Sequence, residues 1–79
     1  MRKVLLVSNH VFLYRVKVYN YFHEAFLRHG IEFSVIAPSI QGAAEARFPL
    51  HILPIRTWSG KRAVLRHIAA ERPDGVILF

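Results

Sequence analysis

Four polar side chains follow the first apolar run of the chain, and their chemistry suits the recognition of hydroxyl groups or anions. Residues 4–8 carry no charge, and His10, Tyr14, Arg15 and Asn20 come after them. An ordinary histidine has a pKa of about 6.5, so it can serve as a base or bind a hydroxyl group near neutral pH. An arginine can hold a phosphate or a carboxylate through two parallel hydrogen bonds. The segment after residue 8 is therefore the first candidate for a binding site.

Each of these side chains also has a structural interpretation, which the sequence leaves open. His10 can satisfy backbone groups of a loop. Arg15 can be a solvated residue in the first turn of a helix, where its charge opposes the helix dipole. Tyr14 and Asn20 are weaker candidates for binding, because an aromatic residue beside a helix usually belongs to the core. The choice depends on the elements that position these residues.

The first half of the chain predicts a buried strand, a loop, a helix and a second strand. Residues 4–8 form the strand and residues 9–14 the loop. In residues 15–29 the apolar side chains recur at helical spacing, and Gly30 follows as a C-cap. Residues 31–37 form the next strand. In parallel sheets the loop after such a first strand faces the ligand crevice.

The middle of the chain predicts a long loop and a peripheral strand. Residues 38–49 are small, polar and irregular, with one helical turn at residues 43–46. Residues 50–55 form a short third strand, which Pro54 interrupts. Because proline has no backbone N–H group, it suits the end of a strand or the edge of a sheet.

The last part of the chain predicts a second helix and a fourth strand. The helix covers residues 61–72, with Ser59 as its N-cap. An uncharged strand over residues 75–79 follows. The expected buried face of the helix consists of Val64, Leu65, Ile68 and Ala69.

The order strand, helix, strand, strand, helix, strand predicts an α/β fold with a partial doubly wound, Rossmann-like parallel sheet. The sequence stops after the fourth strand, so no helix covers that strand and we expect residues 76–79 to be exposed on one face or edge. This suggests that residues 1–79 are the front part of a longer protein.

Composition limits the chain to one small domain. A domain of 79 residues buries only about 60–65% of its unfolded surface, so we expect marginal stability. Cysteine is absent, which excludes a disulfide framework and a thiol nucleophile. The apolar run near the start is too short for a signal peptide core or a membrane span, so we expect a cytoplasmic protein.

The motifs of two common nucleotide sites are missing. A dinucleotide site needs closely spaced glycines after the first strand, and residues 9–14 contain none. A phosphate-cradling loop needs an upstream glycine and a hydroxyl group after its lysine, and Gly60-Lys61-Arg62 has neither. The histidines show no i, i+4 pair that would form a metal face. The sequence therefore predicts no metal and no cofactor within this chain.

Positive charge dominates the sequence, with 11 Lys and Arg residues against 5 Asp and Glu residues. Such an excess favours contact with phosphates in nucleic acids, nucleotides or lipid headgroups. The basic patch near the second helix consists of Arg56, Trp58, Lys61, Arg62 and Arg66. One interpretation is a solvated face with Trp58 in the core. The other is docking on an anionic membrane surface at the inner face of the membrane, with Trp58 at the interface.

Several segments together carry a resemblance to a known family. They are the strand VLLVSNH, the loop Phe12-Leu13-Tyr14-Arg15, the helix start Val16-Lys17-Val18-Tyr19-Asn20-Tyr21-Phe22 and the turn Gly30-Ile31-Glu32-Phe33. The chain in these segments resembles the start of the N-terminal domain of family 4 glycosyltransferases, which have the two-Rossmann-domain GT-B fold. The later ERPDGVILF is similar to the fourth strand of that domain. The resemblance therefore covers the whole chain.

The resemblance implies a sugar transferase whose N-terminal domain shapes the acceptor side of a cleft between two domains. The nucleotide-sugar donor would be held by a C-terminal domain that this chain lacks, so we expect residues 1–79 to be inactive alone. It also implies a sugar or lipid-linked acceptor, bound by His10, Tyr14, Arg15 and Asn20. Many relatives have glycines in the first loop, and their absence here argues against a donor-phosphate contact from that loop.

A second function class stays open, namely a small basic flavodoxin-like module that binds nucleic acid or a protein and catalyses nothing. The net charge of +6 suits such a module. The sequence contains no RNA-binding aromatic signature and no recognition-helix motif, so nucleic acid is the less favoured partner.

Overall fold

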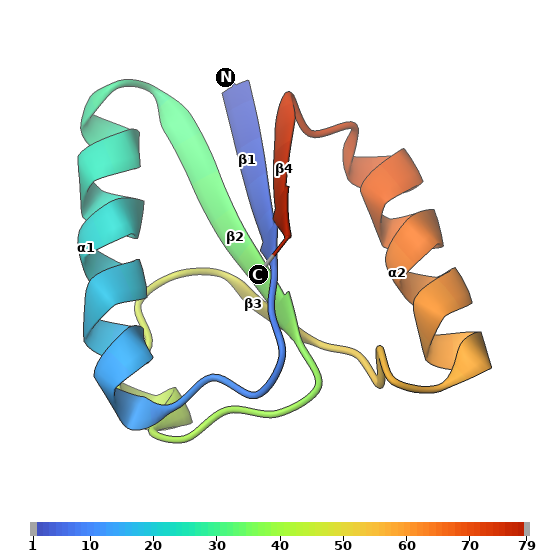
Figure 1. The fold of residues 1–79 in the computed structure, drawn as a ribbon. Coiled ribbons are helices and arrows are strands. Elements are labelled where there is room, and N and C mark those ends of the chain that lie inside the picture. Colours follow the sequence, from blue (N-terminus) through green and yellow to red (C-terminus); the bar gives the residue numbers. More distant parts are fainter. Residues whose placement is uncertain (1, 79) are drawn as a thin grey trace.

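The alternation of apolar strands and amphipathic helices produces one parallel sheet with a helix on each face. A computed structural model describes residues 2–78. Its elements are β1 (Arg2–Val7), α1 (Leu13–Arg28), β2 (Ile31–Ala37), the 3₁₀ turn η1 (Ala43–Glu45), β3 (Leu50–Ile52), α2 (Trp58–Glu71) and β4 (Gly75–Leu78). The strands lie in the order β3-β2-β1-β4, and all neighbours are parallel. The predicted fold class, a partial doubly wound Rossmann-like sheet, is confirmed (Figure 1).

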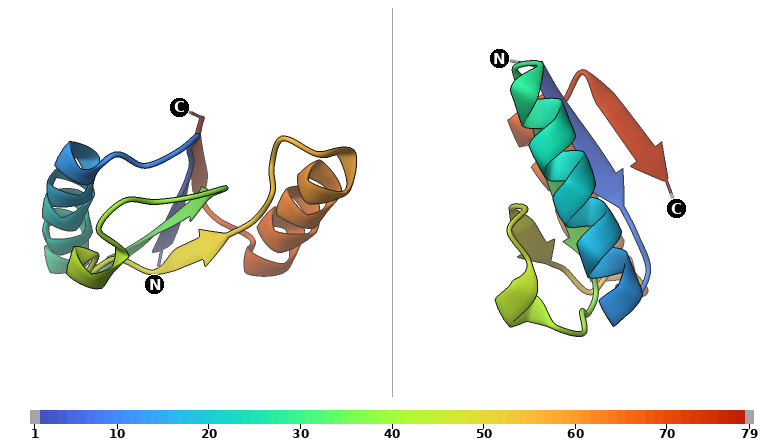
Figure 2. Two further views of the ribbon diagram at one scale, coloured as in Figure 1. Left: turned by 90° about the horizontal axis from the view of Figure 1, so that it is seen from below. Right: turned by 90° about the vertical axis from the view of Figure 1, so that its left-hand side faces the viewer.

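The sheet separates two hydrophobic cores, because successive side chains of a strand point to opposite faces. In β1, Leu6 belongs to the core under α1, and its neighbour Leu5 belongs to the core under α2. In β2, Val35 and Ile36 divide in the same way. The two helices accordingly stand on opposite sides of the sheet in the view from below (Figure 2).

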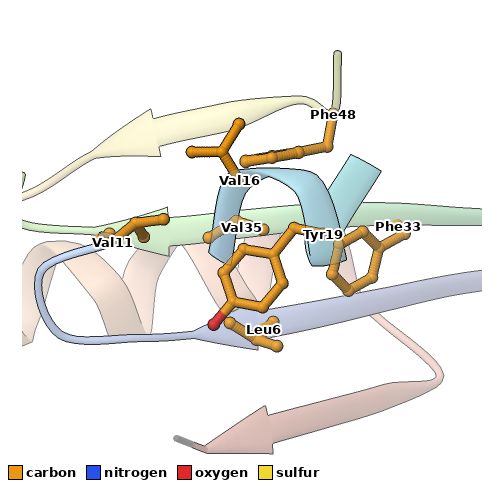
Figure 3. Close-up of a cluster of buried hydrophobic side chains, with 8 residues drawn as sticks. Leu6, Val11, Val16, Tyr19, Phe33, Val35 and Phe48 are labelled. Atoms are coloured by element: carbon orange, nitrogen blue, oxygen red, sulfur yellow. The ribbon is translucent and has the colours of Figure 1, made fainter. Parts of the chain in front are cut away.

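The larger core lies under α1 and is built around aromatic rings. Tyr19 of α1 is 2% exposed, and its ring centroid lies 6.3 Å from that of Phe33 and 5.8 Å from that of Phe48. Phe33 of β2 also contacts Phe26, at 5.6 Å between ring centroids. The buried members of this core are Leu6, Val11, Val16, Tyr19, Phe33, Val35, Ala37 and Phe48 (Figure 3).

The smaller core lies under α2, and two of the four residues predicted for the buried face of this helix pack in it. Val64 is buried and Ile68 packs against it, as expected. Leu65 and Ala69 are exposed, and the prediction that they are buried is wrong. The helix meets the sheet along the narrow stripe of Val64 and Ile68, while Leu65 lines an open groove between α2 and the end of β4.

The N-cap of α2 is Thr57, so the prediction of Ser59 is wrong. Its hydroxyl accepts a hydrogen bond from the Gly60 N–H at 2.9 Å and donates one to the Pro54 carbonyl at 2.9 Å. Pro54 thus turns the chain and fixes Thr57 before the helix begins. Gly60 is needed at this turn, since a Cβ there would lie 1.6 Å from the Pro54 carbonyl oxygen.

Replacing Thr57 with alanine removes the acceptor for the Gly60 N–H, and we expect the free energy of unfolding to fall by about 1 kcal/mol. Ser59→Ala is the matched control: the Ser59 hydroxyl lies 3.4 Å from the Thr57 hydroxyl but accepts no hydrogen bond from a backbone N–H of residues 2–78, so its effect should stay within about 0.5 kcal/mol. Urea unfolding followed by circular dichroism measures both. An equal loss in the two variants would contradict the assignment of the cap.

The two edges of the sheet differ. β3 is the peripheral strand that the sequence predicts, but it ends at Ile52 rather than residue 55. The last hydrogen bond to β2 runs from the Leu53 N–H to the Ala37 carbonyl, at 3.1 Å. The strand pairing stops there because the next residue, Pro54, has no backbone N–H to donate. At the other edge lies β4, whose Val76, Ile77 and Leu78 are exposed as expected. Phe79 lies outside the described residues.

A polar contact ties the start of β1 to the end of α2 and the start of β4. The Lys3 N–H donates to the Asp74 carboxylate at 2.8 Å, and the Asp74 N–H donates to the Lys3 carbonyl at 2.8 Å. The Lys3 ammonium group also donates to the Glu71 carboxylate at 3.1 Å. This hydrogen bond and the attraction between the two charges lower the pKa of Glu71 and raise that of Lys3.

Since folding lowers the pKa of Glu71 below its ordinary 4.5, the stabilisation from the pair is complete above about pH 4.5 and is lost as the pH falls through the folded value. We therefore expect Lys3→Gln to reduce the free energy of unfolding at neutral pH and to matter progressively less below pH 4.5. Urea unfolding across this pH range measures the difference from wild type, with the exposed Lys17→Gln as control. A Lys3→Gln effect that does not change with pH would contradict the role of the ion pair.

Candidate functional site

A cavity of about 230 Å³ lies at the carboxyl end of β1, where the chain turns into α1. Two of the four predicted acceptor-binding residues, His10 and Arg15, line this cavity. The lining residues are Ser8, Asn9, His10, Phe12 and Arg15. The loop after the first strand is therefore hollowed where the fold class leads one to expect a ligand.

The loop is held in place by a neighbouring loop that follows β2. Val11 is fully buried; its N–H donates to the Ser39 carbonyl at 3.0 Å, and its carbonyl accepts from the Gln41 N–H at 2.8 Å. Val11 and Ile40 form an isolated parallel bridge. The loop is thus an ordered continuation of the sheet, and its side chains have defined positions.

The ring of His10 is fixed by two neighbours. Its Nδ1 lies 2.6 Å from the hydroxyl oxygen of Ser39, and its ring packs edge-on to Phe12 with centroids 4.8 Å apart. No hydrogen bond among residues 2–78 uses the other ring nitrogen, Nε2. Sequence reasoning missed Ser39, although it follows the second strand closely, and the carboxyl ends of neighbouring parallel strands meet at one edge.

Arg15 is held by two tyrosines. Its Nη1 donates to the Tyr19 hydroxyl at 3.5 Å, and its guanidinium carbon lies 5.9 Å from the centroid of the Tyr14 ring. Hydrogen bonds with the hydroxyl groups of Tyr19 and Tyr14 raise the pKa of Arg15. The charge is therefore permanent and its position is constrained.

Tyr14 is a surface residue and not part of the core. It is 63% exposed, and its ring stacks on Phe12 with centroids 5.8 Å apart and an interplanar angle of 4°. It does not line the cavity itself but borders a second hollow on α1, of about 280 Å³, to which Arg15 also contributes. Tyr14 and Phe12 together form an aromatic wall beside Arg15.

Asn20 lies away from the cavity, and both ends of its amide are occupied. Its Nδ2 donates to the Glu45 carbonyl at 2.9 Å, and its Oδ1 accepts from the Arg47 N–H at 2.7 Å. Five residues after Arg15, it points about 140° further round the helix. The structure thus places Asn20 as an anchor for the turn η1, apart from the other three candidates.

The predicted basic patch lies on the opposite side of the sheet, at the start of α2. Trp58 is 77% exposed, which excludes the interpretation of a core residue. Arg56, Lys61, Arg62 and Arg66 are exposed as well. A groove of about 400 Å³ runs beside them, and Lys61 is its only charged lining residue; the others are Val7, Ile55, Val64, Leu65, Ile68 and Leu78.

Packing also joins two histidines that lie far apart in the sequence. The ring centroids of His51 and His67 are 4.3 Å apart, and Nε2 of His67 lies 4.0 Å from Glu71. A search for i, i+4 spacing could not find this pair, because it forms between β3 and α2. Within residues 2–78, no three His, Cys, Asp or Glu side chains gather in a way that could hold a metal ion.

Comparison of the chain with protein-family models, curated proteins and solved structures gives no match. Neither helix in residues 2–78 has both the length and the apolar character needed to cross a bilayer.

Proposed function

We propose that the chain is the N-terminal, acceptor-side part of a glycosyltransferase that moves a sugar from a nucleotide-sugar donor to an acceptor. The observation that carries the proposal is the cavity at the carboxyl end of β1, which brings His10 and Arg15 together. The resemblance of the same segment to GT-B enzymes supports it. The donor would bind a C-terminal domain, so this chain alone would bind an acceptor and transfer nothing.

Within that role, the cavity supplies the groups that an acceptor hydroxyl needs. Ser39 holds the His10 ring at Nδ1, so Nε2 is left to contact the acceptor. If Nδ1 carries the proton and donates it to the Ser39 oxygen, Nε2 presents a lone pair and can accept the proton of a hydroxyl group. Arg15 adds a fixed positive charge, and Phe12, backed by the stacked Tyr14 ring, offers an apolar surface for the sugar ring.

Binding measured by ¹⁵N NMR on the 79-residue chain tests this proposal. We expect members of a panel of neutral and phosphorylated monosaccharides to shift the amide signals of His10, Phe12 and Arg15, and UDP-glucose to add nothing beyond its sugar. His10→Ala should abolish the shifts, and Lys17→Ala, on the exposed side of α1, should leave them unchanged. If no saccharide binds and single-stranded RNA binds in a salt-dependent manner instead, the non-enzymatic basic module is the correct function.

The basic patch of Arg56, Trp58, Lys61, Arg62 and Arg66 supports a second role, peripheral binding to the inner face of a membrane. Its exposed indole and cations are the combination that anchors proteins at an anionic interface. The patch lies on the α2 side of the sheet and the cavity at the β1–α1 loop, so membrane contact would leave the cavity open.

Vesicle binding tests the membrane role, with Trp58 as the reporter because the chain has one tryptophan. We expect vesicles containing phosphatidylglycerol to shift its fluorescence to the blue and vesicles of pure phosphatidylcholine to have no effect. Arg62→Gln should weaken the binding about fivefold, since each cation near an anionic surface contributes about 1 kcal/mol. Lys17→Gln is the control on the other helix. Equal binding to both kinds of vesicle would rule out the anionic docking.

A further inference from the structure

The cavity beside β1 is lined by a serine that is almost fully buried and whose hydroxyl group has no partner within residues 2–78. Ser8 is 2% exposed and lines the cavity, and its N–H donates to the Ile36 carbonyl at 2.9 Å. None of the hydrogen bonds among residues 2–78 uses its hydroxyl group. Since Ser8 lines the cavity, its hydroxyl group is available to donate a hydrogen bond to a ligand there.

The groups around Ser8 are donors of hydrogen bonds or carry positive charge. Arg15 presents a guanidinium group, His10 has one ring nitrogen outside its contact with Ser39, and no acidic side chain lines the cavity. α1 starts at the same place: its N-cap, Phe12, makes no side-chain hydrogen bond, and its first turn contains no acidic residue. Gln41 Oε1 accepts from the Leu13 N–H at 3.3 Å, but no acidic side chain in the first turn offsets the positive end of the helix dipole.

We propose that this cavity binds the phosphate group of a phosphorylated sugar. The tetrahedral phosphate can accept hydrogen bonds from the Ser8 hydroxyl, from Arg15 and from His10 Nε2. For this contact Nε2 carries the proton and Nδ1 accepts from the Ser39 hydroxyl, the tautomer opposite to the one that would accept a proton from an acceptor hydroxyl.

The absence of glycine from the first loop is compatible with this site. Glycines are needed where backbone N–H groups bind the phosphate, and here the donors are side chains. Phe12, whose ring borders the cavity, gives the sugar ring an apolar surface. For the sugar part the inference rests on the proposed function, and for the phosphate part it stands alone.

Isothermal titration and ¹⁵N NMR at constant ionic strength test the inference with four probes: inorganic phosphate, glucose 6-phosphate, glucose and glucuronate. We expect glucose 6-phosphate to bind at least tenfold more tightly than glucose and glucuronate, and more tightly than inorganic phosphate. Signals of Ser8, His10 and Arg15 should shift together.

Two variants separate the site from general attraction to a basic protein. Ser8→Ala removes the hydroxyl group with little change in volume, and Arg15→Gln removes the charge; each should weaken glucose 6-phosphate binding about tenfold. Lys17→Gln removes one charge from the same helix outside the cavity and should change the affinity less than twofold. Thermal unfolding of each variant confirms that it is folded.

The outcomes distinguish this inference from the proposed function. Equal affinity for glucose and glucose 6-phosphate overturns the phosphate site and leaves acceptor binding in place. Equal affinity for inorganic phosphate and glucose 6-phosphate keeps the phosphate site and overturns sugar binding at it. A loss with Lys17→Gln as large as with Ser8→Ala, in folded variants, overturns the site as a whole.

Discussion

The central position of β1 is the constraint on which the rest of the structure depends. β1 pairs with β2 on one side and β4 on the other, and its Leu5 and Leu6 are buried in different cores. The enclosed part of the strand, residues 4–7, carries no charge, and the charged Arg2 and Lys3 lie at its more exposed start. At the carboxyl end of the strand, polar side chains occur in the loop after Val7, and this loop lines the cavity.

The positions of the cavity residues depend on the loop after β2 as well as on β1. Val11 bonds to the backbone on both sides of Ile40, and this brings Ser39 to His10. Tyr19, packed between Phe33 and Phe48, holds its hydroxyl group near Arg15. The core under α1 and the cavity are therefore linked through α1. Tyr19 of this helix packs in the aromatic core and also orients the guanidinium group of Arg15.

Residue types and spacing were enough to predict the fold class and to show that His10 and Arg15 belong to the loop and helix start after the first strand. The uncharged strands, the helical spacing after the first loop and the prolines around β3 depend on local chain properties, and the elements they predict are present. The errors concern α2, where contacts outside the helix itself decide which residue caps it and which side chains are buried. Thr57 caps α2 because the Pro54 carbonyl reaches back to it, and Leu65 is exposed because α2 meets the sheet along a narrow stripe.

By itself the sequence determined the order of the elements, the parallel sheet and the loop that carries His10 and Arg15, because periodicity and turn chemistry are properties of neighbouring residues. Only the tertiary structure decided which polar side chains meet. It brought Ser39 to His10, hydrogen-bonded Asn20 to residues of and next to the turn η1, and placed the Ser8 side chain at the cavity. The physical reason is that a hydrogen bond needs its two atoms within about 3 Å, and packing alone sets such distances between residues far apart in the chain.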